Sequence, residues 1–111
     1  RSDDVIITGG VKVSARAVAA VLESHPAVRE AAVMGIPDAR WGSAVAAAIT
    51  LRGASEATCD ILRDFCTDKL GAAGAPKFLR ILADFPTAST GKPDRRAIYS
   101  MLYREYTNTR G

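Results

Sequence analysis

Residues 44–51 read AVAAAITL, an unbroken run of small and apolar side chains with β-branched residues near its end. A second apolar run occupies residues 31–36. Runs of this length and composition predict β-strands that are buried on at least one face. The segment between them, residues 37–42, reads PDARWG and is predicted to be a loop. The centre of the chain therefore predicts two buried strands and the loop that joins them.

On the N-terminal side of these strands the pattern predicts a hairpin and a helix. From residue 5 to residue 13, two short apolar segments flank Gly9 and Gly10, which is typical of a tight turn between strands. Ser14 is the predicted cap of the helix, whose apolar residues recur at helical spacing until the histidine and proline at 25–26 end it.

On the C-terminal side the pattern predicts two more helices and a strand. Ser55 is the predicted cap of the first helix, which ends in the glycine- and alanine-rich stretch 71–75. A short strand is predicted over residues 78–82, and a loop over residues 86–92 precedes a last helix capped by Asp94. The residues that these two helices are expected to bury are Ile61, Leu62, Phe65, Leu70, Ile98, Met101 and Leu102.

This order of elements predicts an α+β fold, with a small central β-sheet and about three helices packed on it. The 111 residues fit one domain, and 48% hydrophobic with 24% charged residues is the balance of a globular protein. A domain of this size has little room for a deep cavity. We therefore expect any sizeable active site to be shared with another domain.

Composition argues against several other classes of protein. No apolar run approaches the roughly 20 residues that cross a bilayer, so no membrane span is expected. Cys59 and Cys66 are predicted to lie roughly 10 Å apart on one helix, too far for a disulfide, and are interpreted as core residues in a reducing cytoplasm. With one histidine in the chain, no metal site is expected. Arg1 at the start, with no signal peptide after it, indicates a soluble piece of a longer protein.

The charge pattern keeps a nucleic-acid-binding module open as an alternative. The net charge is +3 and the pI is near 9.1. Against a nucleic-acid surface, Glu105 interrupts the basic patch and the patch lacks interleaved aromatics in a base-stacking pattern. We therefore favour a solvated helix face and expect no nucleic-acid partner. The arginines concerned are Arg95, Arg96, Arg104 and Arg110.

Five short motifs follow one another in a characteristic order. They are RSDD at residues 1–4, GG at 9–10, HPAV at 25–28, IPD at 36–38 and the loop of residues 86–92, PTASTGK. From Arg1 to about Ile98 the chain resembles the C-terminal domain of the adenylate-forming superfamily, which includes acyl-CoA synthetases, nonribosomal peptide adenylation domains and luciferases. The resemblance implies that residues 1–111 are a mobile C-terminal domain whose partner is a large N-terminal domain.

The resemblance also implies a two-step reaction. Members use ATP and Mg²⁺ to convert a carboxylic acid to an acyl-adenylate, and the ligases then pass the acyl group to coenzyme A (CoA) after the small domain rotates. Lys92 matches the catalytic lysine, which reaches the substrate carboxylate and the α-phosphate. An ammonium there stabilises the negative charge of the transition state. ATP and Mg²⁺ are implied to bind mainly the N-terminal domain, so the fragment alone is expected to be inactive in adenylation.

Further residues are implied to act around Lys92. Asp3 matches the hinge about which the domain turns, and Arg1 matches an arginine near the ribose of the nucleotide. Gly9 and Gly10 match a loop that lines the pantetheine tunnel, where glycine permits close backbone approach. A plain hairpin turn is the alternative for this pair.

Two side chains are implied to lie near CoA. Trp41 matches a tryptophan that some acyl-CoA and aryl-CoA ligases place there, and Lys77 matches a basic residue near the CoA phosphates. The alternatives are a half-buried packing role for Trp41 and a solvated charge for Lys77.

The chain departs from the usual family pattern in two places. Ala17 and Ala19 stand where most members have glutamates, and residues 73–75 lack the usual aromatic and basic residue before Pro76. In these departures it looks like the o-succinylbenzoate-CoA ligases of menaquinone biosynthesis, which makes o-succinylbenzoate the best single guess for the acid. The alternative is the adenylation domain of a peptide synthetase, which loads a carrier protein.

Overall fold

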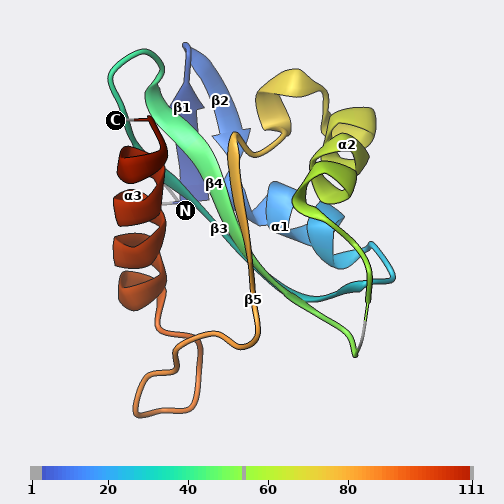
Figure 1. The fold of residues 1–111 in the computed structure, drawn as a ribbon. Helices are drawn as coiled ribbons and strands as arrows, with labels where there is room; N and C mark the ends of the chain where they lie inside the picture. The colour runs from blue at the N-terminus through green and yellow to red at the C-terminus, as the bar shows by residue number, and fades with distance from the viewer. Residues whose placement is uncertain (1–3, 54, 111) are drawn as a thin grey trace.

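The computed structural model describes residues 4–53 and 55–110 and confirms the predicted α+β fold. A three-stranded sheet in the order β3-β4-β5 is accompanied by a two-stranded β1-β2 hairpin. Helices α1 and α2 cover one face of the central sheet, and α3 covers the other (Figure 1). The elements are β1 (Val5–Thr8), β2 (Val11–Ser14), α1 (Ala15–Glu23), β3 (Val28–Asp38), β4 (Gly42–Leu51), α2 (Cys59–Leu70), the 3₁₀ turn η2 (Ala72–Gly74), β5 (Phe78–Leu82) and α3 (Arg95–Arg110).

Strand β4 is the middle strand of the central sheet, antiparallel to β3 and parallel to β5. Every residue from 44 to 50 is fully buried, at 0% exposure. Because successive side chains of a strand point to opposite faces, β4 must be covered on both sides. The sequence predicted burial on at least one face, and the helices on both sides account for the stronger result.

Two hydrophobic clusters form the core, one on each face of the sheet. The first packs α1, α2 and the hairpin against Val45, Ala47 and Ile49 of β4. The second packs Ile98 and Leu102 of α3 against alanines on the opposite face of β4. Each strand of the described residues pairs within one of the two sheets, and both clusters are built from residues of this chain. The domain therefore has a complete core of its own.

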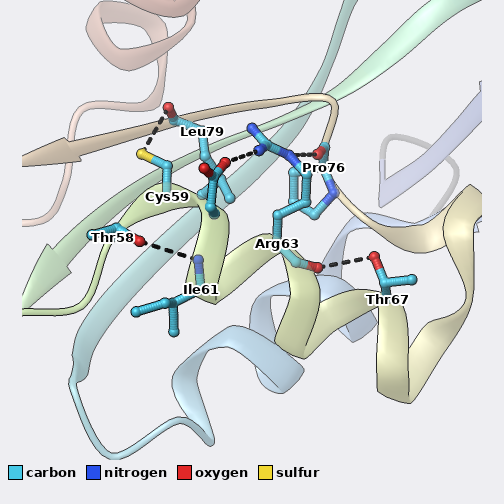
Figure 2. A network of polar contacts seen from close by, with 8 residues as sticks. Thr58, Cys59, Ile61, Arg63, Thr67, Pro76 and Leu79 are labelled. Atoms are coloured by element: carbon cyan, nitrogen blue, oxygen red, sulfur yellow. Dashed lines mark hydrogen bonds and ion pairs between the residues drawn. The ribbon is translucent and has the colours of Figure 1, made fainter.

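Helix α2 begins later than the sequence predicted. Thr58 is its cap, since the Thr58 hydroxyl accepts a hydrogen bond from the amide of Ile61 at 3.2 Å (Figure 2). Ser55 was the predicted cap, but its hydroxyl accepts from the amide of Ala57 at 3.2 Å, ahead of the helix. Both residue types bond to backbone amides two or three positions ahead, so the sequence alone did not separate them.

The inward face of α2 also differs from the prediction. Leu62 and Cys66 are fully buried, and they share a face because they are four residues apart. The prediction that Ile61 and Leu70 point inward is wrong, since they are 50% and 37% exposed. Phe65 is half-buried.

Two side chains of α2 hold the beginning of β5. Arg63 donates through Nε to the carbonyl of Pro76 at 3.0 Å, and Cys59 donates through Sγ to the carbonyl of Leu79 at 3.3 Å (Figure 2). On the other side, the amide of Lys77 donates to the carbonyl of Val45 in β4 at 2.8 Å. The backbone of Lys77 is therefore fixed between α2 and the central strand.

Cys66 offers a test of this packing. Both cysteines are free, as predicted, and burial raises the pKa of the Cys66 thiol to about 11 from its usual 9.0. Above pH 9 the unfolded chain releases this proton while the folded chain keeps it, so folding loses stability as the pH rises towards 11. We expect this group to lower the free energy of unfolding by about 1 kcal/mol at pH 10.

Urea unfolding at pH 8 and pH 10 measures this effect. The difference in stability between the wild type and Cys66→Ala should narrow by about 1 kcal/mol over that interval, because the variant has no thiol to ionise. Cys59→Ala is the matched control, since Cys59 is only partly buried. If the difference in the free energy of unfolding between the wild type and Cys66→Ala were the same at pH 8 and pH 10, the raised pKa of the Cys66 thiol would be contradicted.

Candidate functional site

The two glycines of the predicted hairpin form the turn between β1 and β2, and this turn lies against Trp41. Gly9 and Gly10 have φ angles of +58° and +82°. The amide of Gly9 donates to the carbonyl of Trp41 at 2.8 Å. A Cβ atom at Gly9 would lie only 2.8 Å from Cε3 of the indole, whereas one at Gly10 would meet nothing within 4 Å. Gly9 is thus needed for the contact with Trp41 as well as for the turn.

Trp41 is half-buried, and two cations lie next to its ring. Nζ of Lys77 is 4.5 Å from the ring centroid, and Cζ of Arg40 is 5.2 Å from it. Both distances are within the range of cation–π attraction. The structure therefore brings together three of the residues predicted from the sequence, Gly9, Trp41 and Lys77, and adds Arg40. We call these four residues the Trp41 group.

A short turn between β3 and β4 carries Trp41 and Arg40. The predicted loop of residues 37–42 is shorter than expected, because β3 continues through Asp38, which pairs with Gly42. Asp38 is 8% exposed, and its Oδ1 accepts hydrogen bonds from the amides of Arg40 at 2.8 Å and Trp41 at 2.9 Å. Its Oδ2 accepts from the hydroxyl of the buried Tyr106 on α3.

Sequence reasoning missed three members of this arrangement. Arg40 could have been found from its position beside Trp41 in a turn. Asp38 also had a signal, because aspartate at the start of a turn commonly bonds to the amides ahead of it. Tyr106 had none, since it meets Asp38 from 68 residues away along the chain.

Lys92 lies on the loop between β5 and α3, which is closed by its own backbone. The carbonyl of Lys92 accepts from the amide of Ala88 at 2.8 Å, and the amide of Gly91 donates to the carbonyl of Ala88 at 2.9 Å. Gly91 has a φ angle of +85°, which glycine adopts readily. The Lys92 side chain is exposed. The loop is thus ordered by backbone hydrogen bonds, and it exposes the lysine side chain.

The structure does not bring Lys92 together with the Trp41 group. The β1–β2 turn lies at one end of the domain, and the loop between β5 and α3 lies at the other (Figure 1). The strand register agrees, because Lys77 bonds to Val45 near the start of β4 whereas Leu82 pairs with Thr50 near its end. Arg1 and Asp3, the predicted nucleotide and hinge residues, fall outside the described residues.

The outer face of α3 differs from the prediction in one respect. Tyr99 and Tyr103 are exposed there and stack on each other, with ring centroids 6.2 Å apart and planes 3° from parallel. Aromatics are therefore interleaved with the arginines of this helix, although none was expected. One of those arginines, Arg95, is engaged by the sheet through a 3.0 Å hydrogen bond to the carbonyl of Val33.

Residues 4–53 and 55–110 contain neither a metal-binding cluster nor a membrane-spanning helix. No group of three or more histidine, cysteine, aspartate or glutamate side chains in that part of the chain is arranged to hold a metal ion. None of the helices described there is both long enough and apolar enough to cross a membrane.

With this geometry in place, comparison with known proteins identifies the family. Residues 17–92 match the model of the AMP-binding enzyme C-terminal domain. The chain belongs to this family. The match begins within α1 and covers the whole central sheet and the loop up to Lys92, so it includes Trp41, Lys77 and Lys92 but not Gly9.

Individual relatives are enzymes that are much longer than this chain. The medium/long-chain-fatty-acid–CoA ligase FadD8 of Mycobacterium tuberculosis is 36% identical over an alignment of 110 residues that covers 93% of this chain and 19% of that protein. The protein named "Probable 2-succinylbenzoate–CoA ligase" of the same species is 39% identical over 99 residues, 88% of this chain and 26% of that protein. The chain thus spans about a fifth to a quarter of these relatives.

A solved structure gives the same fold. The amide bond synthetase McbA of Marinactinospora thermotolerans is 35% identical and superimposes with a TM-score of 0.84, over 91% of this chain and 20% of that one. The AMP-binding C-terminal domain is therefore similar both to parts of CoA ligases and to part of an amide bond synthetase.

The contact between Gly9 and Trp41 predicts different effects for two neighbouring substitutions. Gly10→Ala should lower the free energy of unfolding by about 1–2 kcal/mol, because alanine is strained at positive φ. Gly9→Ala should lower it by about 2–4 kcal/mol, since its Cβ also collides with the indole. Urea unfolding gives both values, and Trp41 emission should shift only in Gly9→Ala. Equal losses with unchanged emission in both variants would exclude the close contact.

Proposed function

We propose that the longer protein containing this chain is an ATP-dependent acid–CoA ligase, with residues 1–111 as its mobile C-terminal domain. One observation carries the proposal: Lys92 and the Trp41 group lie at opposite ends of a domain whose sheet is covered by a hydrophobic cluster on each face (Figure 1). Each end therefore needs another domain to complete a site around it. A domain that rotates can present the two ends in turn to one cleft, as a two-step reaction requires.

In the first step, Lys92 is proposed to act on the acid and ATP. The carboxylate attacks the α-phosphorus, the acyl-adenylate forms and pyrophosphate leaves, and negative charge collects on the oxygens around phosphorus. An ammonium placed there from the Lys92 loop stabilises this charge more in the transition state than in the ground state. The exposed position of Lys92 supports this role, because the side chain is free to enter a cleft in another domain.

In the second step, the Trp41 group is proposed to bind CoA. CoA carries an aromatic base and several phosphates, and the group offers an indole ring with Lys77 and Arg40 beside it. When Lys77 and Arg40 turn from the ring to bind phosphate oxygens, an adenine can stack on the indole face that they leave. The Gly9–Gly10 turn adds a backbone edge without side chains, which suits the narrow pantetheine arm of CoA.

The remaining components belong to the proposed N-terminal domain. We propose that ATP, Mg²⁺ and the acid bind there, with Arg1 near the ribose of the nucleotide and Asp3 at the hinge. A cytoplasmic location is proposed as well, in keeping with two unpaired cysteines.

For the acid we propose o-succinylbenzoate, and hence a role in menaquinone biosynthesis. The 39% identity to the probable 2-succinylbenzoate–CoA ligase supports this choice, as does the resemblance to such ligases at Ala17 and Ala19. The similarity to an amide bond synthetase favours a second candidate acceptor of the acyl group, an amine in place of the CoA thiol.

The direct test is the reaction of the full-length protein with ATP, Mg²⁺, CoA and a panel of carboxylic acids. Mass spectrometry should detect succinylbenzoyl-CoA together with AMP and pyrophosphate. A different thioester would retain the ligase proposal and exclude this acid. Acyl-adenylate without any thioester would contradict CoA as the acceptor, and an amide formed from an added amine would replace it.

Substitution of Lys92 tests the division of labour between the two ends. In the full-length protein, Lys92→Ala should slow adenylate formation by about 10²-fold or more, because one transition-state charge contact is lost. Transfer of the acyl group from a supplied acyl-adenylate to CoA should change much less, since Lys92 is then at the far end of the domain.

The control for this test is Lys69→Ala. Lys69 is an exposed lysine in the last turn of α2, packed over the ring of Phe65, so its loss removes the same charge elsewhere. Both half-reactions should stay near the wild-type rate in this variant. Equal slowing of the two half-reactions by Lys92→Ala would refute the alternation between ends.

A further inference from the structure

The turn that carries Trp41 and Arg40 is held from behind by one buried carboxylate. Oδ1 of Asp38 accepts the amides of both residues, at 2.8 Å for Arg40 and 2.9 Å for Trp41. Hydrogen bonds to an ionised acceptor are stronger than those between neutral groups. Because Asp38 is the last residue of β3, these bonds tie the turn to the end of a core strand.

Tyr106 connects the same carboxylate to α3. Its hydroxyl donates to Oδ2 of Asp38, and its side chain is 6% exposed. The Tyr106 ring also packs edge-on against Phe78, with ring centroids 5.6 Å apart. Phe78 is the first residue of β5 and directly follows Lys77. Tyr106 therefore contacts Asp38, which holds the amide of Trp41, and Phe78, which follows Lys77 in the chain.

We propose that Asp38 and Tyr106 are positioning residues for Trp41, which act by holding the β3–β4 turn rather than by touching a substrate. Nothing in the family match accounts for Tyr106, since the match ends at residue 92. The structural part of the proposal concerns the turn alone. Its consequence for CoA binding rests on the proposed function.

The hydrogen bonds that hold the β3–β4 turn determine how strongly a substitution should loosen Trp41. Only residues 39–41 separate β3 from β4, and two of the three amides in this stretch bond to the one Asp38 oxygen. Loss of the Tyr106 hydroxyl removes a donor from the buried carboxylate and favours its rotation towards water. A lost hydrogen bond to a charged group shifts such an equilibrium by roughly tenfold or more. The indole should then leave Gly9 more often.

Trp41 is the single tryptophan of the 111-residue chain, so its fluorescence measures this directly. The domain has its own core and can be studied by itself. Acrylamide quenching of Trp41 should increase in Tyr106→Phe, which removes one oxygen and leaves the ring. The matched control is Tyr103→Phe on the preceding turn of α3, an exposed tyrosine that should leave quenching at the wild-type value.

Two substitutions of Asp38 separate hydrogen bonding from bulk stability. Asp38→Asn keeps an oxygen for both amides and an NH₂ group that can donate to the Tyr106 hydroxyl, so quenching should stay near the wild-type value. Asp38→Ala removes all these bonds, and quenching should rise above that of Tyr106→Phe. Thermal unfolding of every variant shows whether it is folded at the temperature of measurement.

Three outcomes would overturn the proposal. A folded Tyr106→Phe protein with wild-type quenching would show that the hydroxyl does not hold the turn. Equal quenching in folded Asp38→Asn and Asp38→Ala would exclude the hydrogen bonds as the cause. A Tyr106→Phe protein that is unfolded where Tyr103→Phe is folded would make the contact a requirement for folding, and not for the placement of Trp41.

The consequence for CoA is tested separately in the full-length protein. Tyr106→Phe should raise the KM for CoA roughly five- to tenfold while leaving the rate of adenylate formation unchanged, and Asp38→Asn should keep a KM near the wild-type value. A loosened Trp41 with an unchanged KM for CoA would retain the positioning role and contradict the proposed CoA site. The failure of one proposal is thus distinguishable from the failure of the other.

Discussion

Strand β4 is buried on both faces, and the rest of the domain is arranged around this constraint. A strand covered on two sides needs side chains that fill each layer without forcing the layers apart. The alanines of β4 meet that need, since α3 packs onto one face while α1 and α2 pack onto the other. A domain of 111 residues built in this way uses its interior for packing. Functional groups are consequently left to the ends of the strands.

The direction of the strands then decides which groups share an end. Because β5 runs parallel to β4, Lys77 comes to lie near the start of β4, beside the β3–β4 turn with Trp41. Strand β5 then runs away from the β3–β4 turn, so the loop with Lys92 begins beyond the opposite end of the sheet. The separation of the two groups is therefore a property of the sheet topology and does not depend on details of the loops.

The sequence predicted what depends on local pattern. Apolar runs located the strands of the central sheet, and the glycines at 9–10 and at 91 marked turns that the backbone does contain. The cap of α2 was placed wrongly because Ser55 and Thr58 offer the same chemistry three residues apart. The resemblance to a known family named Gly9, Trp41 and Lys77 individually, and only the fold showed that they touch.

What the sequence could not provide were contacts between distant positions. Arg40 and Asp38 lie close to Trp41 in the chain, so their roles follow once the turn is known. Tyr106 is different, because no periodicity connects it to a carboxylate 68 residues earlier. Its helical spacing from Leu102 predicts only that it faces the core. Pairing between its hydroxyl and Asp38 depends on how α3 crosses the sheet, which is a tertiary property.

Helix α3 has one more consequence for a domain that is proposed to act from two ends. It starts directly after the Lys92 loop and reaches the Asp38 carboxylate through Tyr106, so a single rigid element links both groups. From Arg95 to Tyr106 the helix rises about 17 Å at the usual helical rise. Two groups held that far apart cannot occupy one catalytic centre together. If both act on the same acyl group, as proposed, the whole domain must turn between the steps, and the stiffness of α3 makes local loop movement an inadequate substitute.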